Sequence, residues 1–380
     1  MDPVTLTLDD IDGRHHEVLA ALRAQQPVAW VPALNGWVVT SRALAVQVMR
    51  DPDTYTVDDP RFSTAQVVGP SMLSLDGPEQ QRHRAPFADA LRPAVSNARY
   101  AERIAEAADG LVRALLPAGR GELRRGLAGP LAVAVSAMAL GIEHLPAERL
   151  LTLYDRIVAA VDGVARGGAV SADGLAAFDD LAVALRASMQ RPGTLMADAR
   201  AALSDGETVS NAAVFLFGGI ETSEGMTANL LVHLLTPDEV GHRAFDDVVA
   251  DPSLVDAAVE ESLRLEPAAS RVDRYATADA ELGGATVCRG DLVIVSLAAA
   301  NRDPVTFDLA DRFDLRRPEA RQHVTFAVGP HACIAAQLAR LQARAAVEAL
   351  VRHVPTARLE AVVTPAGVVF RKPDAVPVRW

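Results

Sequence analysis

Apolar residues recur along most of this chain every three or four positions, the spacing that places them on one face of a helix. Bounded by Pro or Gly, such stretches predict helices over residues 78–91, 94–116, 128–141, 146–165, 172–189, 194–203, 238–249 and 253–265. Shorter stretches predict helices over 20–25, 41–50 and from about 334 to 352. Residues 208–235 predict the longest helix, and it is apolar around much of its circumference, which is typical of a buried helix.

Alternation of apolar and polar residues replaces the helical spacing in three places. Residues 27–40 predict two short strands around the turn Asn35-Gly36, and residues 274–295 and 358–378 predict further strands. Residues 54–75 show no clear period and predict a long irregular loop, a feature that often binds ligands. The chain is therefore predicted to be mainly α with a small β region. No repeat or linker divides it, so residues 1–380 are expected to form a single domain.

Composition narrows the functional classes. Half of the 380 residues are apolar, enough for a large core, and the net charge of −12 disfavours nucleic acid as a partner. No window reaches the roughly twenty apolar residues that span a bilayer, and the first thirty residues show no secretory signal. The two cysteines, Cys288 and Cys333, form no CxxC motif and no disulfide framework. These features predict a cytoplasmic protein that does not bind membranes.

Cys333 is the first candidate for chemistry. It follows the turn Gly329-Pro330 and comes just before a predicted helix. The unpaired amides and positive dipole end of a helix favour a thiolate over a thiol. Such a thiolate is either a nucleophile or a soft metal ligand, whereas a lone cysteine without this context is more often a small buried apolar residue.

The long predicted helix contains the second candidate, Phe217-Gly218-Gly219-Ile220-Glu221-Thr222. Each glycine inside a helix costs about 1 kcal/mol relative to Ala, so the pair indicates a need for space beside the helix. The Thr222 hydroxyl is expected to bond the Gly218 carbonyl and open the helix there. A close helix crossing would also explain the glycines, but it leaves Glu221 unexplained, since an unpaired buried carboxylate is costly.

A third motif is Glu261-Ser262-Leu263-Arg264. The spacing of three puts Glu261 and Arg264 on one helix face, where such a pair is usually a solvated surface bridge.

Taken in order, these motifs resemble the cytochrome P450 monooxygenases. Phe326, Gly329, His331 and Cys333 are similar to the haem-binding loop of that family, with Ala335 in place of a final Gly. Residues 217–222 resemble its distal helix, Glu261 and Arg264 its buried Glu-x-x-Arg pair, and matching segments run from Met72 to Arg344. The resemblance implies the cytochrome P450 fold.

The resemblance also implies haem b as cofactor, with Cys333 as the axial thiolate and metal ligand. Thr222 would hydrogen-bond dioxygen and Glu221 would relay protons. Arg312 would join Glu261 and Arg264 as a third structural member. The residues expected to hold the cofactor are Gln80, Arg84, Arg274, His323, Phe326, Gly329, His331, Cys333 and Ala335. Gln80 stands where family members commonly have His, which weakens one propionate contact.

By the same resemblance the chain would insert one atom of O2 into a small to medium-sized apolar substrate, by hydroxylation or epoxidation, in secondary metabolism. The expected pocket residues are Val67, Val68, Met72, Leu73, Phe217, Gly218, Ala268, Ala269 and Val368. Electrons would come from a ferredoxin and its ferredoxin reductase, docked near Arg340 and Arg344. Two alternatives stay open: a haem-thiolate enzyme for oxidative coupling or rearrangement, and a non-catalytic haem carrier or sensor, against which the Glu221-Thr222 pair argues.

Overall fold

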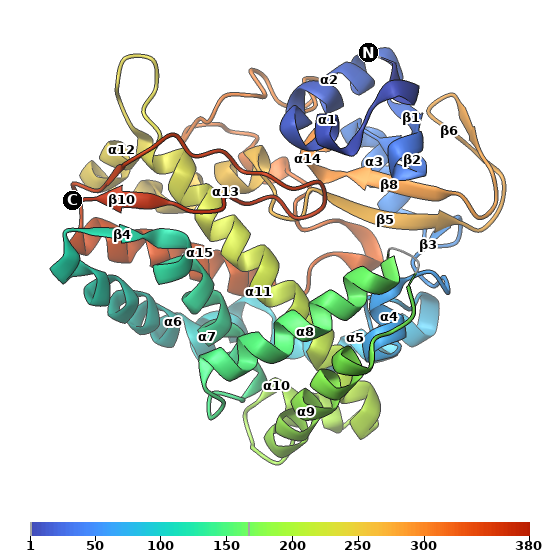
Figure 1. The fold of residues 1–380 in the computed structure, drawn as a ribbon, viewed down its shortest axis with the longest axis horizontal. Helices are drawn as coiled ribbons and strands as arrows, with labels where there is room; N and C mark the ends of the chain where they lie inside the picture. The colour runs from blue at the N-terminus through green and yellow to red at the C-terminus, as the bar shows by residue number, and fades with distance from the viewer. Residues whose placement is uncertain (1, 166–167) are drawn as a thin grey trace.

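Helices make up most of the chain in the computed structural model, which describes residues 2–165 and 168–380 (Figure 1). The N-terminal part contains α1 (Leu8–Gly13), α2 (His15–Gln25), α3 (Arg42–Arg50), α4 (Ser63–Val68) and α5 (Gly77–Ala90). The middle part contains α6 (Pro93–Leu115), α7 (Gly129–Leu140), α8 (Ala147–Ala165), α9 (Ala172–Ser188), α10 (Leu195–Arg200) and α11 (Asp205–Leu235). The C-terminal part contains α12 (Ala244–Ala250), α13 (Val255–Leu265), α14 (Leu297–Ala300) and α15 (Ala336–His353).

The β region is small, and its main sheet lies on the opposite side of the molecule from β4 and β10 (Figure 1). Five strands form the main sheet in the order β1-β2-β8-β5-β3, with β2 and β8 parallel and the other pairs antiparallel. Their bounds are β1 Val28–Val31, β2 Gly36–Val39, β3 Tyr55–Thr56, β5 Arg271–Ala276 and β8 Leu292–Ser296. A second sheet joins β4 (Arg120–Glu122), β10 (Pro377–Arg379) and β9 (Arg358–Leu359), while β6 (Ala280–Leu282) and β7 (Ala285–Val287) form a hairpin.

The helix α11 crosses the middle of the molecule and is buried along most of its length (Figure 1). Its N-terminus is closed by a capping box in which Ser204 and Glu207 bond each other's amides. It packs against α7, α13 and α15, so it brings the two halves of the chain into one apolar core. The predicted long buried helix is confirmed.

Most predicted elements are present, and three predictions are wrong. Residues 54–75 are not all irregular, because they include β3 and α4; α4 depends on tertiary packing of the buried Val67 and Val68. Residues 238–243 are not helical, because the Asp238 carboxylate accepts bonds from the amides of Val240 and His242 and makes a turn. Between β9 and β10 the predicted strand is mostly irregular.

None of the helices in the described residues is long and apolar enough to cross a membrane.

Candidate active site

The loop before α15 is held in a single conformation by its own backbone. The Cys333 amide donates to the Phe326 carbonyl at 2.7 Å, which closes the loop. Gly329 has φ +79°, and a Cβ there would lie 2.5 Å from the Met49 carbonyl oxygen of α3. Glycine is therefore required at this position both by the left-handed backbone and by the close approach of α3. The turn before a helix that the sequence predicts is confirmed.

The Cys333 side chain is exposed, although protein surrounds it closely enough that burial raises the pKa of the thiol. The Ala335 amide and the charges of Arg84 and Arg340 lower the pKa, so the helix terminus acts in the expected direction but burial outweighs it. In the free side chain, burial thus favours the thiol form. A bound metal ion would change this, because a coordinating thiol is deprotonated.

Helix α13 and the turn after α14 support the loop from behind. The Thr325 hydroxyl donates to the Leu263 carbonyl at 2.6 Å and accepts from the Asn301 side chain at 2.8 Å. The Asn301 side-chain oxygen also accepts from the Val324 amide at 2.7 Å. Asn301 thus fixes both residues that precede Phe326. Sequence analysis missed this function of Asn301.

The Glu261 and Arg264 pair is fully buried, with both side chains 0% exposed. The guanidinium Nε and Nη2 each donate to a Glu261 oxygen at 2.8 Å. Arg264 also bonds the carbonyls of Asn301 and Ala310, so it joins α13 to the segments that support the cysteine loop. The pair is therefore not a solvated surface bridge.

The third member of this cluster is Arg317, not the predicted Arg312. Arg317 Nε donates to Glu261 at 3.0 Å, and its side chain is 5% exposed. Arg312 is exposed and contributes only its backbone carbonyl, which accepts from Arg264 and Arg317. The chain turns between the two arginines, so the carbonyl at 312 points inward while its side chain points to solvent.

The two adjacent glycines of α11 have different surroundings. A Cβ on Gly219 would lie 2.8 Å from Ser136 Oγ, so Gly219 permits a close crossing with α7. A Cβ on Gly218 would meet nothing within 4 Å, and Gly218 is exposed although most of α11 is buried. The close-crossing explanation thus holds for Gly219, whereas Gly218 borders open space.

Thr222 lies on the same open side of α11. Its hydroxyl donates to the Gly218 carbonyl, as predicted. The helix nevertheless stays α-helical through this turn, so the expected opening does not occur. An accessible hydroxyl therefore stands one turn from the exposed Gly218.

The distal helix and the cysteine loop meet around a crevice of about 20 Å³. Its lining includes Phe215, Gly219 and Ser223 of α11 opposite Ala335 and Leu338 of α15. Ala335 has φ −99°, a conformation that needs no glycine, so its departure from the family pattern costs no backbone strain. The structure thus brings two motifs that are remote in sequence into contact.

Glu221 is paired rather than isolated. Lys372 Nζ, from the segment before β10, lies 2.8 Å from Glu221 and 2.6 Å from Glu224. The Tyr154 hydroxyl of α8 donates to Glu221 at 3.4 Å. Burial and the Glu221 charge raise the pKa of Tyr154, so the phenol stays protonated and remains a donor. Sequence analysis missed both partners, although Lys372 is the only lysine in the chain.

Arg274 is the clearest candidate anion-binding residue. It is 4% exposed, and in the described part of the chain its guanidinium makes one hydrogen bond, to the Asp273 carbonyl. Burial lowers the pKa of Arg274, which is the cost of desolvating a cation without a bonded carboxylate. A propionate would satisfy this group, so the residue fits the predicted function.

The other predicted propionate ligands are arranged differently. On α5, Gln80 donates to the Pro330 carbonyl at 2.9 Å and Arg84 donates to the Ala332 carbonyl, so both also brace the cysteine loop. His331 bonds Asp76 at 2.7 Å. His323 does not fit the prediction: its Nε2 bonds Glu260 and its Nδ1 accepts from the Thr325 amide, which leaves no ring nitrogen for a propionate.

The predicted pocket residues fall into two groups. Val67, Val68, Met72 and Ala268 are buried within the packed core, whereas the partly accessible ones are Leu73, Phe217, Gly218, Ala269 and Val368. Phe217 packs against two rings that sequence analysis missed, Tyr154 at 6.4 Å and Phe370 at 6.1 Å between centroids. These rings become neighbours only through folding.

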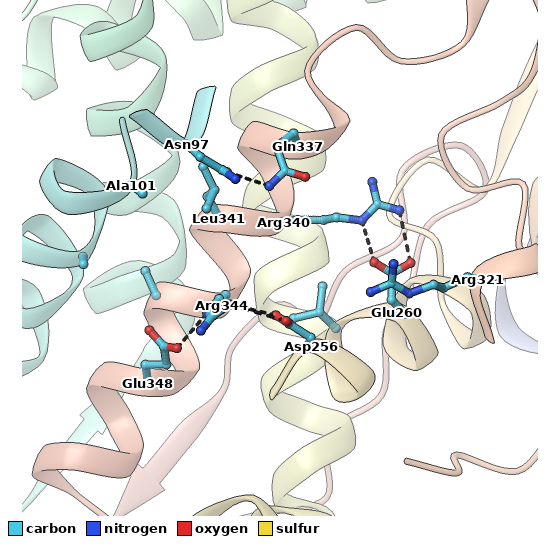
Figure 2. Close-up of a pocket in the computed structure, with 13 residues that line it drawn as sticks. Asn97, Ala101, Asp256, Glu260, Arg321, Gln337, Arg340, Leu341, Arg344 and Glu348 are labelled. Carbon is cyan, nitrogen blue, oxygen red and sulfur yellow. Dashed lines mark hydrogen bonds and ion pairs between the residues drawn. The ribbon is translucent and has the colours of Figure 1, made fainter. Parts of the chain in front are cut away.

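A groove of about 860 Å³ runs along the outer side of α15, between α6 and α13 (Figure 2). Arg340 bonds Glu260, and its guanidinium lies 4.6 Å from the Phe326 ring. Arg344 bonds Glu348 and Asp256. These acids balance the charges of both arginines, so the predicted basic surface is not a patch of unpaired positive charge.

The described residues fit a haem. The accessible Cys333 thiol would bind the iron, and the open space next to Gly218 would admit the ring. Arg274, which is buried without a bonded carboxylate, would bind a propionate. The donor set is one soft sulfur ligand with cationic groups nearby, as a haem thiolate requires.

Comparisons with known proteins agree with this geometry. The Cytochrome P450 family model matches residues 180–356. Cytochrome P450 monooxygenase PikC of Streptomyces venezuelae is 32% identical over 95% of this chain and 90% of its own length. Nocardicin C N-oxygenase of Nocardia uniformis subsp. tsuyamanensis is 32% identical over 100% and 97%. The crystal structure of CalO2 superimposes with a TM-score of 0.87 at 29% identity, covering 100% of this chain and 98% of that one. The chain therefore belongs to the cytochrome P450 family and is a haem-dependent monooxygenase.

Proposed function

We propose that residues 1–380 act as one domain that binds haem b through Cys333 and inserts one atom of O2 into a small to medium-sized apolar substrate. The observation that carries this proposal is the accessible Cys333 thiol, two residues before Ala335, which lines a crevice together with Phe215 and Gly219 of α11. The haem, when bound, supplies oxygen activation. The protein supplies the thiolate, the protons and a shaped apolar site.

Each residue of the site has a defined task in this proposal. Cys333 binds the iron, and Arg274, Arg84 and His331 bind the propionates. Thr222 donates its hydroxyl proton into the space beside Gly218 once it releases the Gly218 carbonyl. Glu221 takes protons from solvent and returns them toward Thr222, since its side chain is 23% exposed and one residue away.

The first experiment replaces Cys333 with alanine in the haem-loaded protein. The ferrous carbon monoxide spectrum should lose its thiolate signature, because the variant lacks the sulfur ligand. Thr222→Ala should keep that signature and lose product formation by tenfold or more, the usual range for a proton donor being 10²–10⁴. An unchanged spectrum in Cys333→Ala would overturn the proposal, and a wild-type protein that binds haem without any turnover would favour the carrier alternative.

We expect the substrate pocket to be lined by the partly accessible residues Leu73, Phe217, Ala269 and Val368, whose apolar side chains suit an apolar substrate of moderate size. The rings of Tyr154 and Phe370 beside Phe217 favour a flat or hydrophobic moiety there. The relative named nocardicin C N-oxygenase makes a secondary metabolite a reasonable class. Titration of the ferric protein with such compounds, followed by the iron spin state, identifies those that bind. A set in which only charged compounds bind would contradict the proposed class.

A ferredoxin is the proposed electron donor, docking at the groove along α15 (Figure 2). Arg340 is unsuitable for testing this, because its contacts with Glu260 and Phe326 also support the cysteine loop. Arg344 is 49% exposed and lines the groove, whereas Arg352, 61% exposed, bonds Asp109 and lies outside the groove lining. Reduction by a ferredoxin should slow in Arg344→Glu and stay unchanged in Arg352→Glu, with the haem spectrum intact in both. Equal rates in the two variants would remove this docking site.

A further inference from the structure

We infer that Lys372 is a positioning residue that holds the acid Glu221 at the edge of the active site and thereby controls proton delivery. The inference rests on the proposed function of Glu221. It adds a residue from a part of the chain in which none of the family motifs lies. It also predicts that the C-terminal segment shapes both the pocket wall and the proton path.

The contacts form a chain of alternating charge across three elements. Arg124, from the π-helical turn Arg124–Ala128, bonds Glu224 at 3.0 Å. Glu224 bonds Lys372 at 2.6 Å, and Lys372 bonds Glu221 at 2.8 Å. Arg124 pairs with Glu224, so the cation that pairs with Glu221 is Lys372.

Glu221 and Thr222 are bonded to different groups in this arrangement. The Glu221 carboxylate is held by Lys372 and Tyr154, while the Thr222 hydroxyl is bonded to Gly218. In the described part of the chain, no hydrogen bond joins Glu221 to Thr222. A proton can pass between them only if the carboxylate turns or a water molecule bridges the gap. Lys372 fixes the position of the Glu221 carboxylate from which either transfer would start.

Lys372 is itself fixed by the pocket wall. Its backbone pairs with Ala366 through two hydrogen bonds of 3.1 Å, which close a turn over residues 366–372. The same turn contains Val368 and Phe370, and Phe370 packs against Phe217 of α11. A ligand that displaces this wall would therefore also displace the ammonium group.

Glu221 faces further acidic residues on α8 and on its own helix, α11. Asp155 of α8 and Glu224 of α11 face the same site, and burial together with the Glu221 charge raises the pKa of Asp155. Tyr154 is neutral, and Arg124 and Lys372 are the facing cations among the described residues. Without Lys372, Glu221 would face like charges with no cation bonded to it, and their repulsion would turn its carboxylate toward solvent.

The presence of a single lysine allows a direct test of the contact in the holoenzyme. Protein labelled with ¹³C-lysine should give one ε-carbon resonance, that of Lys372. The resonance should shift in Glu221→Gln and stay in place in the control Glu281→Gln, whose side chain bonds Thr286 in the β6–β7 hairpin. A resonance that is identical in wild type and Glu221→Gln would overturn the inference without reference to turnover.

The functional arm compares Lys372→Met with Lys372→Arg. Lys372→Met should at least halve the product formed per O2 consumed, release more hydrogen peroxide and enlarge the solvent deuterium isotope effect, with the ferrous carbon monoxide spectrum unchanged. Lys372→Arg keeps the charge and should recover most of the loss. Adding Glu221→Gln to Lys372→Met should cause little further loss, because the two residues act as one unit.

The outcomes separate this inference from the proposed function. If Glu221→Gln lowers coupling but Lys372→Met does not, Lys372 has no positioning function and the inference is wrong. If Glu221→Gln itself has no effect, the proposed proton relay fails first.

Discussion

Two acid-centred clusters on the neighbouring helices α13 and α11 differ in their access to solvent. Glu261 of α13 is 0% exposed and bonds Arg264, Arg317 and the Asp314 amide. Glu221 of α11 is 23% exposed and bonds one ammonium group and, more weakly, one phenol. The first cluster has every oxygen committed, so it can only hold structure. The second has an accessible carboxylate, so it can exchange protons.

The difference follows from the groups that each cluster binds. Arg264 and Arg317 also bond backbone carbonyls between residues 301 and 312, so the sealed cluster fixes a long irregular segment behind the cysteine loop. The open cluster joins α11 to Tyr154, Arg124 and Lys372 through contacts between side chains. Rigid support on the cysteine side and adjustable contacts on the distal side suit a site that keeps its metal ligand and moves its protons.

The largest expected effect comes from opening the sealed cluster. Arg317→Ala should lower the free energy of unfolding by about 3–5 kcal/mol, because it leaves Glu261 buried with one partner fewer. Urea unfolding of the holoenzyme measures this. The matched control is Arg312→Ala, which removes an exposed side chain and should change stability by about 0.5 kcal/mol or less. Equal losses in the two variants would mean that the sealed cluster is assigned to the wrong arginine.

The contrast between Arg317 and Arg312 also shows where prediction from sequence stops. Each of the motifs around Cys333, Gly218 and Glu261 spans only a few residues of the chain, so local spacing is sufficient to find it. Choosing between two arginines five positions apart depends on the direction in which an irregular segment turns. No periodicity encodes that direction.

Contacts between residues that are far apart in the sequence could not be predicted either. A partly buried carboxylate such as Glu221 requires a partner, but no residue pattern near it indicates that the partner is Lys372. The family resemblance places His323 at the cofactor, whereas its actual partner, Glu260 of α13, is remote in the sequence. The sequence predicted where chemistry resides, and tertiary packing decided which side chains meet.

A second test sharpens the comparison through pH. Burial alone would raise the pKa of Glu260, but hydrogen bonds from His323 and Arg340 outweigh it and hold the pKa at about 2 instead of its ordinary 4.5. A carboxyl with a lowered pKa stabilises the fold above pH 4.5 and loses that contribution as the pH falls toward 2. The shift corresponds to about 3 kcal/mol. Stability measured between pH 4.5 and pH 2.5 should therefore fall more steeply in wild type than in Glu260→Gln. Parallel curves would show that the bonds from His323 and Arg340 do not lower the pKa of Glu260.

Alanine substitutions at the two adjacent glycines should have smaller effects on stability, and the two effects should be opposite in sign. Gly219→Ala should cost about 1–3 kcal/mol, because its methyl group would overlap Ser136. Gly218→Ala meets nothing and should raise stability by about 0.5–1 kcal/mol through better helix propensity. Thermal unfolding distinguishes the two. Gly218→Ala should also weaken substrate-induced spin-state changes, because the methyl group enters the open space. If both variants destabilise equally, Gly218 does not border that space.

The smallest stability effect is expected where the functional effect is large. Lys372→Met removes one cation from the open cluster, but Arg124 still serves Glu224 and the Tyr154 hydroxyl still serves Glu221. The remaining carboxylates are partly accessible and can be hydrated or protonated. The free energy of unfolding should therefore fall by about 1 kcal/mol or less, the usual range for an accessible ion pair. Urea unfolding of Lys372→Met beside Arg317→Ala measures the contrast directly. A loss as large as that of Arg317→Ala would mean that Lys372 supports the fold in the way Arg317 does, and the distinction between a sealed and an open cluster would no longer hold.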